Sequence, residues 1–269
     1  MSMEITVAKN AGFCFGVRRA TESLERTIEN SSKSHRIFTL GALIHNDTYN
    51  AMLKNRGVEV TSIEHAEELA KSATADSPVT LFIRAHGIVK QDEELLAALH
   101  EKYPYFSYVD CTCPFVKKIH KIAAQSSSED NLFILIGKAT HPEVVGIMSY
   151  FDYDKVVFSS SEEVESAISE GFFEKYKKKT PIIAAQTTQN LSEWKKTQKI
   201  FKKLYTNARF FDTICNVTDF RQKETEALAK RSDVMIVVGG ADSSNTAKLY
   251  DICKRFCSRS FRVYKIFVV

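Results

Sequence analysis

The feature that most constrains the fold is an internal repeat. Three segments share one order, which is a short apolar strand, a turn that contains cysteine, and an amphipathic helix with basic residues in its first turns. The cysteines are Cys14, Cys113 and Cys215, and successive members are 99 and 102 residues apart. A chain that repeats one supersecondary unit is expected to place equivalent residues at equivalent points of the fold.

The similarity continues beyond each of these helices. A second apolar stretch ends in glycine, and a polar residue follows four positions later: Gly41 and His45, Gly137 and His141, Gly239 and Ser243. Another helical pattern and another apolar stretch come next in all three copies. The first two copies then continue into LFIRAHGI and IIAAQTTQN, which the third copy does not reach.

Strand patterns that alternate with helical patterns of roughly 10–15 residues predict parallel α/β units. We therefore expect an α/β fold of three domains related by approximate threefold symmetry, residues 1–110, 111–212 and 213–269. A third copy of full length would run to about residue 315. We accordingly expect the third domain to be incomplete, with an apolar edge strand near its end and with reduced stability and activity.

The repeat predicts a shared centre for the cysteines, because loops at the carboxyl ends of parallel strands form the ligand site. Three thiolates at helix N-termini suit a 4Fe–4S cluster with one open iron, whereas zinc usually has close CxxC pairs, which this chain lacks. Plain core packing is the other interpretation. Cys111 is a small strand-end residue or a fourth ligand, and Cys253 with Cys257 fits a core face.

Polar loops at the same strand ends predict an anion site. His45, His86 and His141 follow strand ends, and Ser243, Ser244 and Asn245 open a helix, where backbone N–H groups favour phosphate. Structural histidines and ordinary N-caps are the competing interpretations. No role is assigned to the other histidines, which are His35, His65, His100 and His120.

Glu143 and two threonines are candidates for proton chemistry. Glu143 follows His141 and can move protons if it faces the centre, although acids are also common in first helical turns. Thr187 and Thr188 end a strand pattern of the second copy. They can hydrogen-bond to substrate or to Glu143, or they can simply begin a helix.

Composition excludes several classes of protein. The 269 residues are 44% hydrophobic and 26% charged, as in an ordinary globular protein, and the net charge of +4 argues against an extended nucleic-acid surface. No apolar run approaches the ~18 residues of a membrane span, and the N-terminus lacks the pattern of a signal peptide. We therefore expect a cytoplasmic protein, not bound to membrane, with reduced cysteines.

Together these motifs resemble the LytB family of 4-hydroxy-3-methylbut-2-enyl diphosphate reductases. The matching segments occur in order over about residues 3–257 and read GFCFGV, IHN, AHG, DCTCPFVKKIH, THPEV, QTT, ICNVT with RQ, and SSN. The resemblance implies three α/β domains around a central iron–sulfur cluster. It also implies reductive removal of the C4 hydroxyl of an allylic diphosphate, which gives isopentenyl and dimethylallyl diphosphate in the non-mevalonate isoprenoid pathway.

The resemblance also implies roles for single residues. Cys14, Cys113 and Cys215 would bind one 4Fe–4S cluster per chain, and Glu143 with Thr187 would deliver a proton near the C4 oxygen. The substrate and its diphosphate would contact a larger set, which is His45, His86, His141, Thr187, Ser243, Ser244 and Asn245. The implied partners are the small-molecule allylic diphosphate and an electron donor such as ferredoxin or flavodoxin.

Two departures from the family pattern keep a second hypothesis open. Cys111 stands where the family usually has a small non-thiol residue. The family also has a further strand and a loop whose serine binds the diphosphate, and this sequence ends at Val269 without them. The alternative to a working reductase is a non-catalytic relative that binds a cluster or a ligand.

Overall fold

The computed structural model describes residues 4–264, whose strands form three parallel sheets. The first sheet has the order β2 (Val58–Thr61), β1 (Arg36–Leu40), β3 (Val79–Ile83), β4 (Phe106–Asp110). The second has the order β6 (Lys155–Phe158), β5 (Asn131–Ile136), β7 (Thr180–Ala185), β8 (Arg209–Phe210). In the third, β10 (Ser260–Val263) pairs with β9 (Met235–Val238). The first two sheets have the same strand order, and the pair in the third corresponds to their first two strands. All pairings are parallel, which confirms the predicted parallel α/β units.

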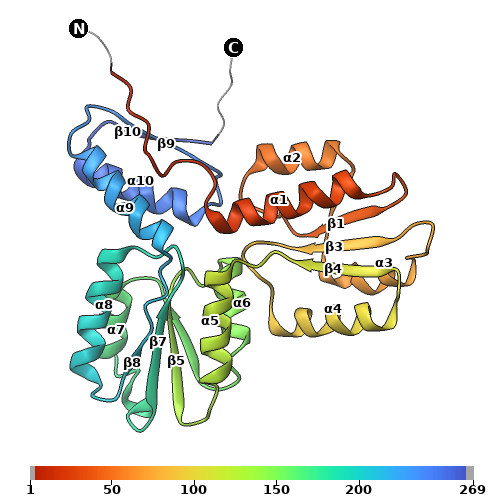
Figure 1. Ribbon diagram of the computed structural model, residues 1–269. Helices are drawn as coiled ribbons and strands as arrows, with labels where there is room; N and C mark the ends of the chain where they lie inside the picture. The colour runs from red at the N-terminus through yellow and green to blue at the C-terminus, as the bar shows by residue number, and fades with distance from the viewer. Residues whose placement is uncertain (1–3, 265–269) are drawn as a thin grey trace.

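Helices cover both faces of the first two sheets (Figure 1). On the first sheet, α1 (Phe15–Asn30) and α2 (Asp47–Asn55) pack on one face, and η1 (Ile63–His65), α3 (Ala66–Lys71) and α4 (Lys90–Lys102) pack on the other. On the second, α5 (Pro114–Gln125) and α6 (Pro142–Ser149) face α7 (Ser161–Ser169), η2 (Glu174–Tyr176) and α8 (Leu191–Leu204) across the sheet. No helix within residues 4–264 is both long and apolar enough to cross a bilayer.

The core of the second sheet shows why apolar runs form its strands. Successive side chains of a strand point to opposite faces. In β5, Leu132 and Ile134 pack toward α7 and α8, whereas Phe133 and Leu135 pack toward α5 and α6. All four are fully buried. A strand that is covered on both faces therefore needs an unbroken apolar run, as in NLFILI.

The third sheet is covered less completely. The helices α9 (Asn216–Ala229) and α10 (Ser244–Phe256) belong to this part of the chain, and the described residues contribute two strands where the other sheets have four. Ile236 and Phe261 lie side by side in the β9–β10 register and are 63% and 53% exposed. One face of this sheet is therefore open to solvent.

The strand predicted before Cys14 is wrong. Residues 4–8 form no strand, and Ile5 and Val7 are 76% and 74% exposed. The following residues are held by side chains of α9: Glu224 accepts a hydrogen bond from the backbone N–H of Asn10 at 3.0 Å, and Arg221 Nε donates to the Asn10 carbonyl at 2.8 Å. A strand needs a neighbouring strand with free backbone groups, and none of the strands within residues 4–264 pairs with this segment.

Candidate active site

The three repeat cysteines lie at the starts of three helices. Cys14, Cys113 and Cys215 are the N-cap residues of α1, α5 and α9, and the N-terminal ends of these helices meet near the middle of the molecule (Figure 1). A methyl group added at Gly16 would lie 2.6 Å from Sγ of Cys113, so α1 packs directly on that thiol. The structure thus brings together three thiols from distant parts of the chain.

Charge effects show the same proximity. Burial raises the pKa of Cys113, the backbone N–H groups of Phe115 and Val116 oppose that shift, and the thiols of Cys14 and Cys215 each raise it further. At Cys215, the sulfur accepts a hydrogen bond from the backbone N–H of Thr218 at 3.3 Å. N–H donors at a helix start stabilise a thiolate, which is the form that binds metal.

The spacing of the thiols distinguishes between metal centres. Within residues 4–264, the only three His, Cys, Asp or Glu side chains with ligand atoms all within 4.8 Å of one another are three histidines. Around one zinc ion, Zn–S bonds of about 2.3 Å hold sulfurs no more than about 4.6 Å apart. The three repeat thiols do not form such a compact group among the described residues. In a 4Fe–4S cluster each thiolate binds a different iron, so wider spacing of the sulfurs is expected there.

The remaining cysteines belong to the core. Cys111, Cys253 and Cys257 are at most 5% exposed. Burial raises the pKa of Cys111 to about 11 and that of Cys253 to about 11, and Cys257 Sγ donates to the Ser232 carbonyl at 3.4 Å. Protonated, buried thiols are poor metal ligands. The prediction of core packing for Cys253 and Cys257 is confirmed.

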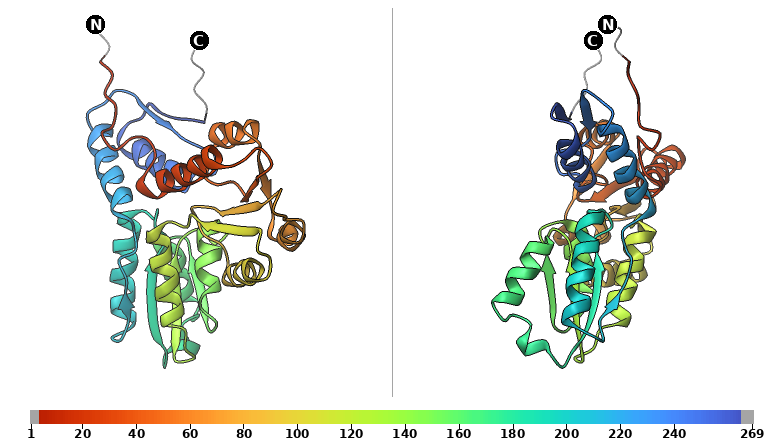
Figure 2. Two further views of the ribbon diagram at one scale, coloured as in Figure 1. Left: turned by 45° about the vertical axis from the view of Figure 1, so that its right-hand side comes forward. Right: turned by 90° about the vertical axis from the view of Figure 1, so that its left-hand side faces the viewer.

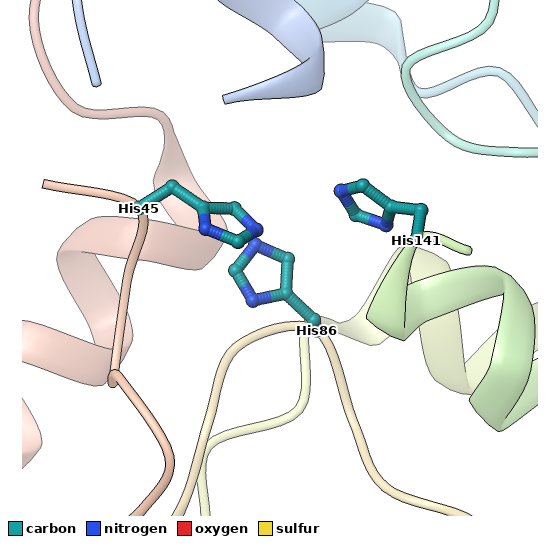
Figure 3. Close-up of side chains that lie close together, drawn as sticks. All are labelled: His45, His86 and His141. Carbon is teal, nitrogen blue, oxygen red and sulfur yellow. The ribbon is translucent and has the colours of Figure 1, made fainter. Parts of the chain in front are cut away.

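Three histidines from separate segments turn their rings toward one another (Figure 3). His45 follows β1, His86 follows β3, and His141 caps α6. The ring centroids of His45 and His86 are 4.1 Å apart, and that of His141 lies 5.5 Å and 5.6 Å from the other two. We call these three side chains the imidazole group.

The rings of the imidazole group are neutral, and two of their nitrogens lack a hydrogen-bond partner. Burial is the main cause that lowers the pKa of all three rings, that of His141 to about 4. Nδ1 of His141 accepts from the Glu143 backbone N–H at 3.1 Å, so its proton is on Nε2. Nε2 of His45 and Nδ1 of His86 are buried without a partner. Buried polar atoms of this kind indicate a ligand.

Arg84 indicates that this ligand is an anion. Three neutral imidazoles are also suitable metal ligands, and at His45 the charges of Asp242 and Asp47 raise the pKa. The charge of Arg84 lowers the pKa of every member of the imidazole group, and a bound anion would be attracted to that charge. Arg84 Nε donates to the Gly87 carbonyl at 3.3 Å, and no carboxylate lies within 4.0 Å of Arg84 in the described chain. The sequence analysis missed this residue. A cationic side chain at the end of a buried strand, two positions before His86, was the available signal.

The start of α10 adjoins the imidazole group. A methyl group at Gly240 would lie 2.3 Å from the His45 carbonyl oxygen, so the loop after β9 contacts that segment directly. Ser243 Oγ caps α10 by accepting from the Thr246 N–H at 3.2 Å, and Ser244 Oγ accepts from Thr188 Oγ1 at 2.9 Å. Asn245 is half-buried in the same first turn. Helix capping explains the position of the Ser243 hydroxyl. The free backbone N–H groups at the start of α10 still favour an anion.

Glu143 is a buried acid next to the imidazole group. It is 2% exposed, and its two carboxylate oxygens accept from the Thr187 N–H at 2.7 Å and from Thr187 Oγ1 at 2.9 Å. Burial raises the pKa of Glu143 to about 7, although both bonds from Thr187 oppose the shift. A carboxyl group with such a pKa gains and loses a proton near neutral pH.

Known proteins are similar to this chain over nearly its whole length. The family model described as LytB protein matches residues 5–266. The 4-hydroxy-3-methylbut-2-enyl diphosphate reductase of Caldanaerobacter subterraneus is 36% identical over 97% of this chain and 84% of its own length. The enzyme of that name from Aquifex aeolicus is 34% identical over 97% of this chain and 83% of its own length.

Solved structures agree with this result. A structure of (E)-4-hydroxy-3-methyl-but-2-enyl diphosphate reductase, described as the terminal enzyme of the non-mevalonate pathway, has a TM-score of 0.65 and 32% identity over 96% of this chain and 85% of the other. A reductase structure from Plasmodium falciparum has a TM-score of 0.77 at 24% identity over 94% of this chain and 73% of the other, which shows the shared fold. The chain belongs to the LytB family.

Proposed function

We propose that this chain is a 4-hydroxy-3-methylbut-2-enyl diphosphate reductase. The substrate R–OH takes up two electrons and two protons and gives R–H and water, where R–H is isopentenyl or dimethylallyl diphosphate. The observation that carries the proposal is one centre that combines three helix-start thiols, the imidazole group and a buried acid. A non-catalytic relative is not favoured, because curated relatives that match nearly the whole chain are named as this reductase.

Three domains would build this centre. Residues 1–110 supply Cys14 and two histidines, residues 111–212 supply Cys113 and the Glu143–Thr187 pair, and residues 213–269 supply Cys215 and the start of α10. Cys14, Cys113 and Cys215 would hold one 4Fe–4S cluster. When bound, such a cluster passes electrons singly and offers an open, Lewis-acidic iron toward the substrate oxygen.

The diphosphate would bind at the imidazole group. Its negative charge is favoured by Arg84 and by the N-terminus of α10 at Ser243, Ser244 and Asn245. An anion beside His45, His86 and His141 would raise the pKa of these rings, so binding is expected to take up protons. The orphaned ring nitrogens of His45 and His86 would then have the partners that they lack.

Glu143 would supply a proton to the departing hydroxyl. Its carboxyl has the protonation equilibrium that this task requires, and Thr187 fixes both of its oxygens. Thr187 therefore positions the acid and would contact the substrate beside it. The electrons would come from a protein such as ferredoxin or flavodoxin.

The test is a turnover assay. The protein is reconstituted anaerobically with iron and sulfide, supplied with reduced methyl viologen and 4-hydroxy-3-methylbut-2-enyl diphosphate, and the products are identified by mass spectrometry. We expect both isoprenoid diphosphates to form only with the reconstituted protein. Substrate binding without any product from a protein that holds its iron would favour the non-catalytic relative.

A further inference from the structure

The segment that leads into Cys14 has almost no packing of its own. Residues 9–12 are exposed, and none of the strands within residues 4–264 pairs with them. The hydrogen bond from the Ala11 N–H to the Ala8 carbonyl at 3.2 Å only closes a turn inside the segment. On this side, the place of Cys14 therefore depends on contacts with other parts of the chain.

Arg221 on α9 holds the carbonyl groups of this segment, which passes beside that helix (Figures 1 and 2). Its Nε donates to the Asn10 carbonyl at 2.8 Å, and its Nη2 donates to the Gly12 carbonyl at 2.5 Å. Because both donors belong to one planar guanidinium, they orient the backbone as well as hold it.

Glu224, three residues further along α9, holds the N–H groups of the same segment. Its carboxylate accepts from the Lys9 N–H at 2.6 Å, from the Asn10 N–H at 3.0 Å and from Asn10 Nδ2 at 2.9 Å. Residues three apart lie on the same side of a helix. We call Arg221 and Glu224 the α9 clamp. Its bonds all involve a charged partner, and such hydrogen bonds are stronger than those between neutral groups.

Gly12 connects the α9 clamp to Cys14. Its φ of +88° lies in the left-handed region, which glycine adopts readily, so the chain can turn sharply at this position. Only Phe13 separates Gly12 from Cys14. A shift of the clamped Gly12 carbonyl would therefore be passed on to the thiol.

The helix that carries the clamp also begins at a thiol. Cys215 is the N-cap of α9, and Arg221 follows six residues later, about 9 Å along the helix axis. A helix transmits position along its axis because every residue inside it is hydrogen-bonded to the next turn. The α9 clamp thus ties the segment before Cys14 to the helix of Cys215.

We infer that Arg221 and Glu224 are positioning residues that hold Cys14 in register with Cys215 for binding an iron–sulfur cluster. This inference rests on the proposed function, because it concerns a ligand of the proposed cluster. Partners that orient a metal ligand from outside the ligand set commonly change metal affinity by about 10–100-fold when they are removed. Loss of the clamp should therefore leave the fold intact and make the cluster more labile.

Hydrogen exchange of the iron-free protein tests the contact itself. Arg221→Gln and Glu224→Gln each remove part of the clamp, and Lys223→Gln is the matched control, because Lys223 pairs with Asp219 inside α9 at 2.8 Å. Mass spectrometry should show the amides of residues 9–12 exchanging about tenfold faster in both clamp variants and unchanged in the control. Unchanged exchange in the clamp variants would overturn the inference.

Iron release from the reconstituted protein tests the consequence for Cys14. Transfer of iron to a chelator should be about tenfold faster from Arg221→Gln than from wild type or Lys223→Gln. Arg221→Lys keeps the charge and one donor and should restore part of the difference. The melting temperature of the iron-free variants should match that of wild type, because residues 9–12 are exposed. Equal release from wild type and Arg221→Gln, or faster release that the control shares, would contradict the positioning role.

Turnover separates the failure of this inference from that of the proposed function. Iron-loaded wild type that forms no product with reduced methyl viologen would reject the reductase, and the exchange and release rates would still decide on the clamp. Normal turnover of wild type, with no faster iron release from either clamp variant, would reject the clamp alone.

Discussion

The thiols and the imidazole group come from the same repeat but differ in spacing and burial. The thiols begin helices, are partly exposed and do not form a compact group like that of the imidazoles among the described residues. The imidazoles follow strand ends, lie with ligand atoms within 4.8 Å of one another and are neutral. The comparison teaches that one scaffold can hold two chemistries: soft, separated donors suit a cluster, and compact, neutral donors beside Arg84 suit an anion.

The two groups also differ in symmetry. Each of the three copies provides one thiol, whereas the first copy provides both His45 and His86, the second provides His141, and the third has Ser243 at the equivalent position. Strand register shows the same asymmetry, because Ile83 pairs with Leu40 as Ala185 pairs with Ile136. Gln186 therefore occupies in the second copy the place that Arg84 has in the first.

The largest effect is expected on the thiol side. Cys113→Ser should remove most of the roughly four irons per reconstituted chain, and turnover with it, because three thiolates are the whole protein ligand set of the proposed cluster. Iron content and visible absorption measure the loss. The matched control is Cys257→Ser, which changes a core thiol and should keep both the iron and the visible absorption. Full iron in the Cys113 variant would contradict the assignment.

A smaller effect, confined to the chemical step, is expected at Glu143. Glu143→Gln keeps the shape and the hydrogen bond from Thr187 but cannot release a proton. We expect turnover to fall about 10²-fold or more, with unchanged iron and unchanged binding of substrate. Single-turnover assays and calorimetry measure the two quantities separately. Near-normal turnover in the iron-loaded variant would exclude Glu143 as the proton donor.

On the imidazole side, Arg84→Gln introduces the residue of the second copy. Loss of a desolvated cation next to the bound anion should weaken binding of inorganic pyrophosphate about 30-fold, or about 2 kcal/mol, with iron content unchanged. Arg84→Lys keeps the charge without the planar guanidinium and should recover part of the affinity. Equal affinity in wild type and Arg84→Gln would show that this charge does not contribute to the site.

The smallest effect concerns a buried histidine outside both groups. Burial lowers the pKa of His120 to about 4, and its ring stacks on Tyr150 at 4.2 Å. The native state therefore binds fewer protons than the unfolded state, and its stability falls as the pH drops below the ordinary histidine value of about 6.5. We expect the lowered pKa of His120 to reduce the free energy of unfolding by about 1–2 kcal/mol between pH 7 and pH 5.

Thermal unfolding at both pH values measures that cost. His120→Phe removes the titrating group and keeps an aromatic ring against Tyr150, so its melting temperature should depend less on pH than that of wild type. The exposed His65 provides the control, His65→Phe. An unchanged pH dependence in His120→Phe would assign the acid sensitivity to the imidazole group, where His141 has a similarly lowered pKa.

The sequence by itself determined the order of the helices and strands and the place of each repeat cysteine at the start of a helix. The apolar runs 36–40, 131–136 and 235–238 are strands, and the helices begin directly after Cys14, Cys113 and Cys215, as the repeat predicted. This was possible because strand and helix periodicity, turn glycines and helix starts are local properties of the chain. The same locality explains the failure at residues 4–8, where an apolar pattern was present but no strand in the described part of the chain pairs with it.

Only the tertiary structure decided how the site works. The contact between the imidazoles, the pKa of Glu143 and the closeness of Arg84 to three histidines depend on distances between segments and on burial. Such quantities arise when separate sheets pack together, because desolvation and Coulomb energy depend on what surrounds a group in space. The sequence identified the residue types for a cluster and an anion, and the packing made the imidazoles neutral and gave the buried acid an exchangeable proton.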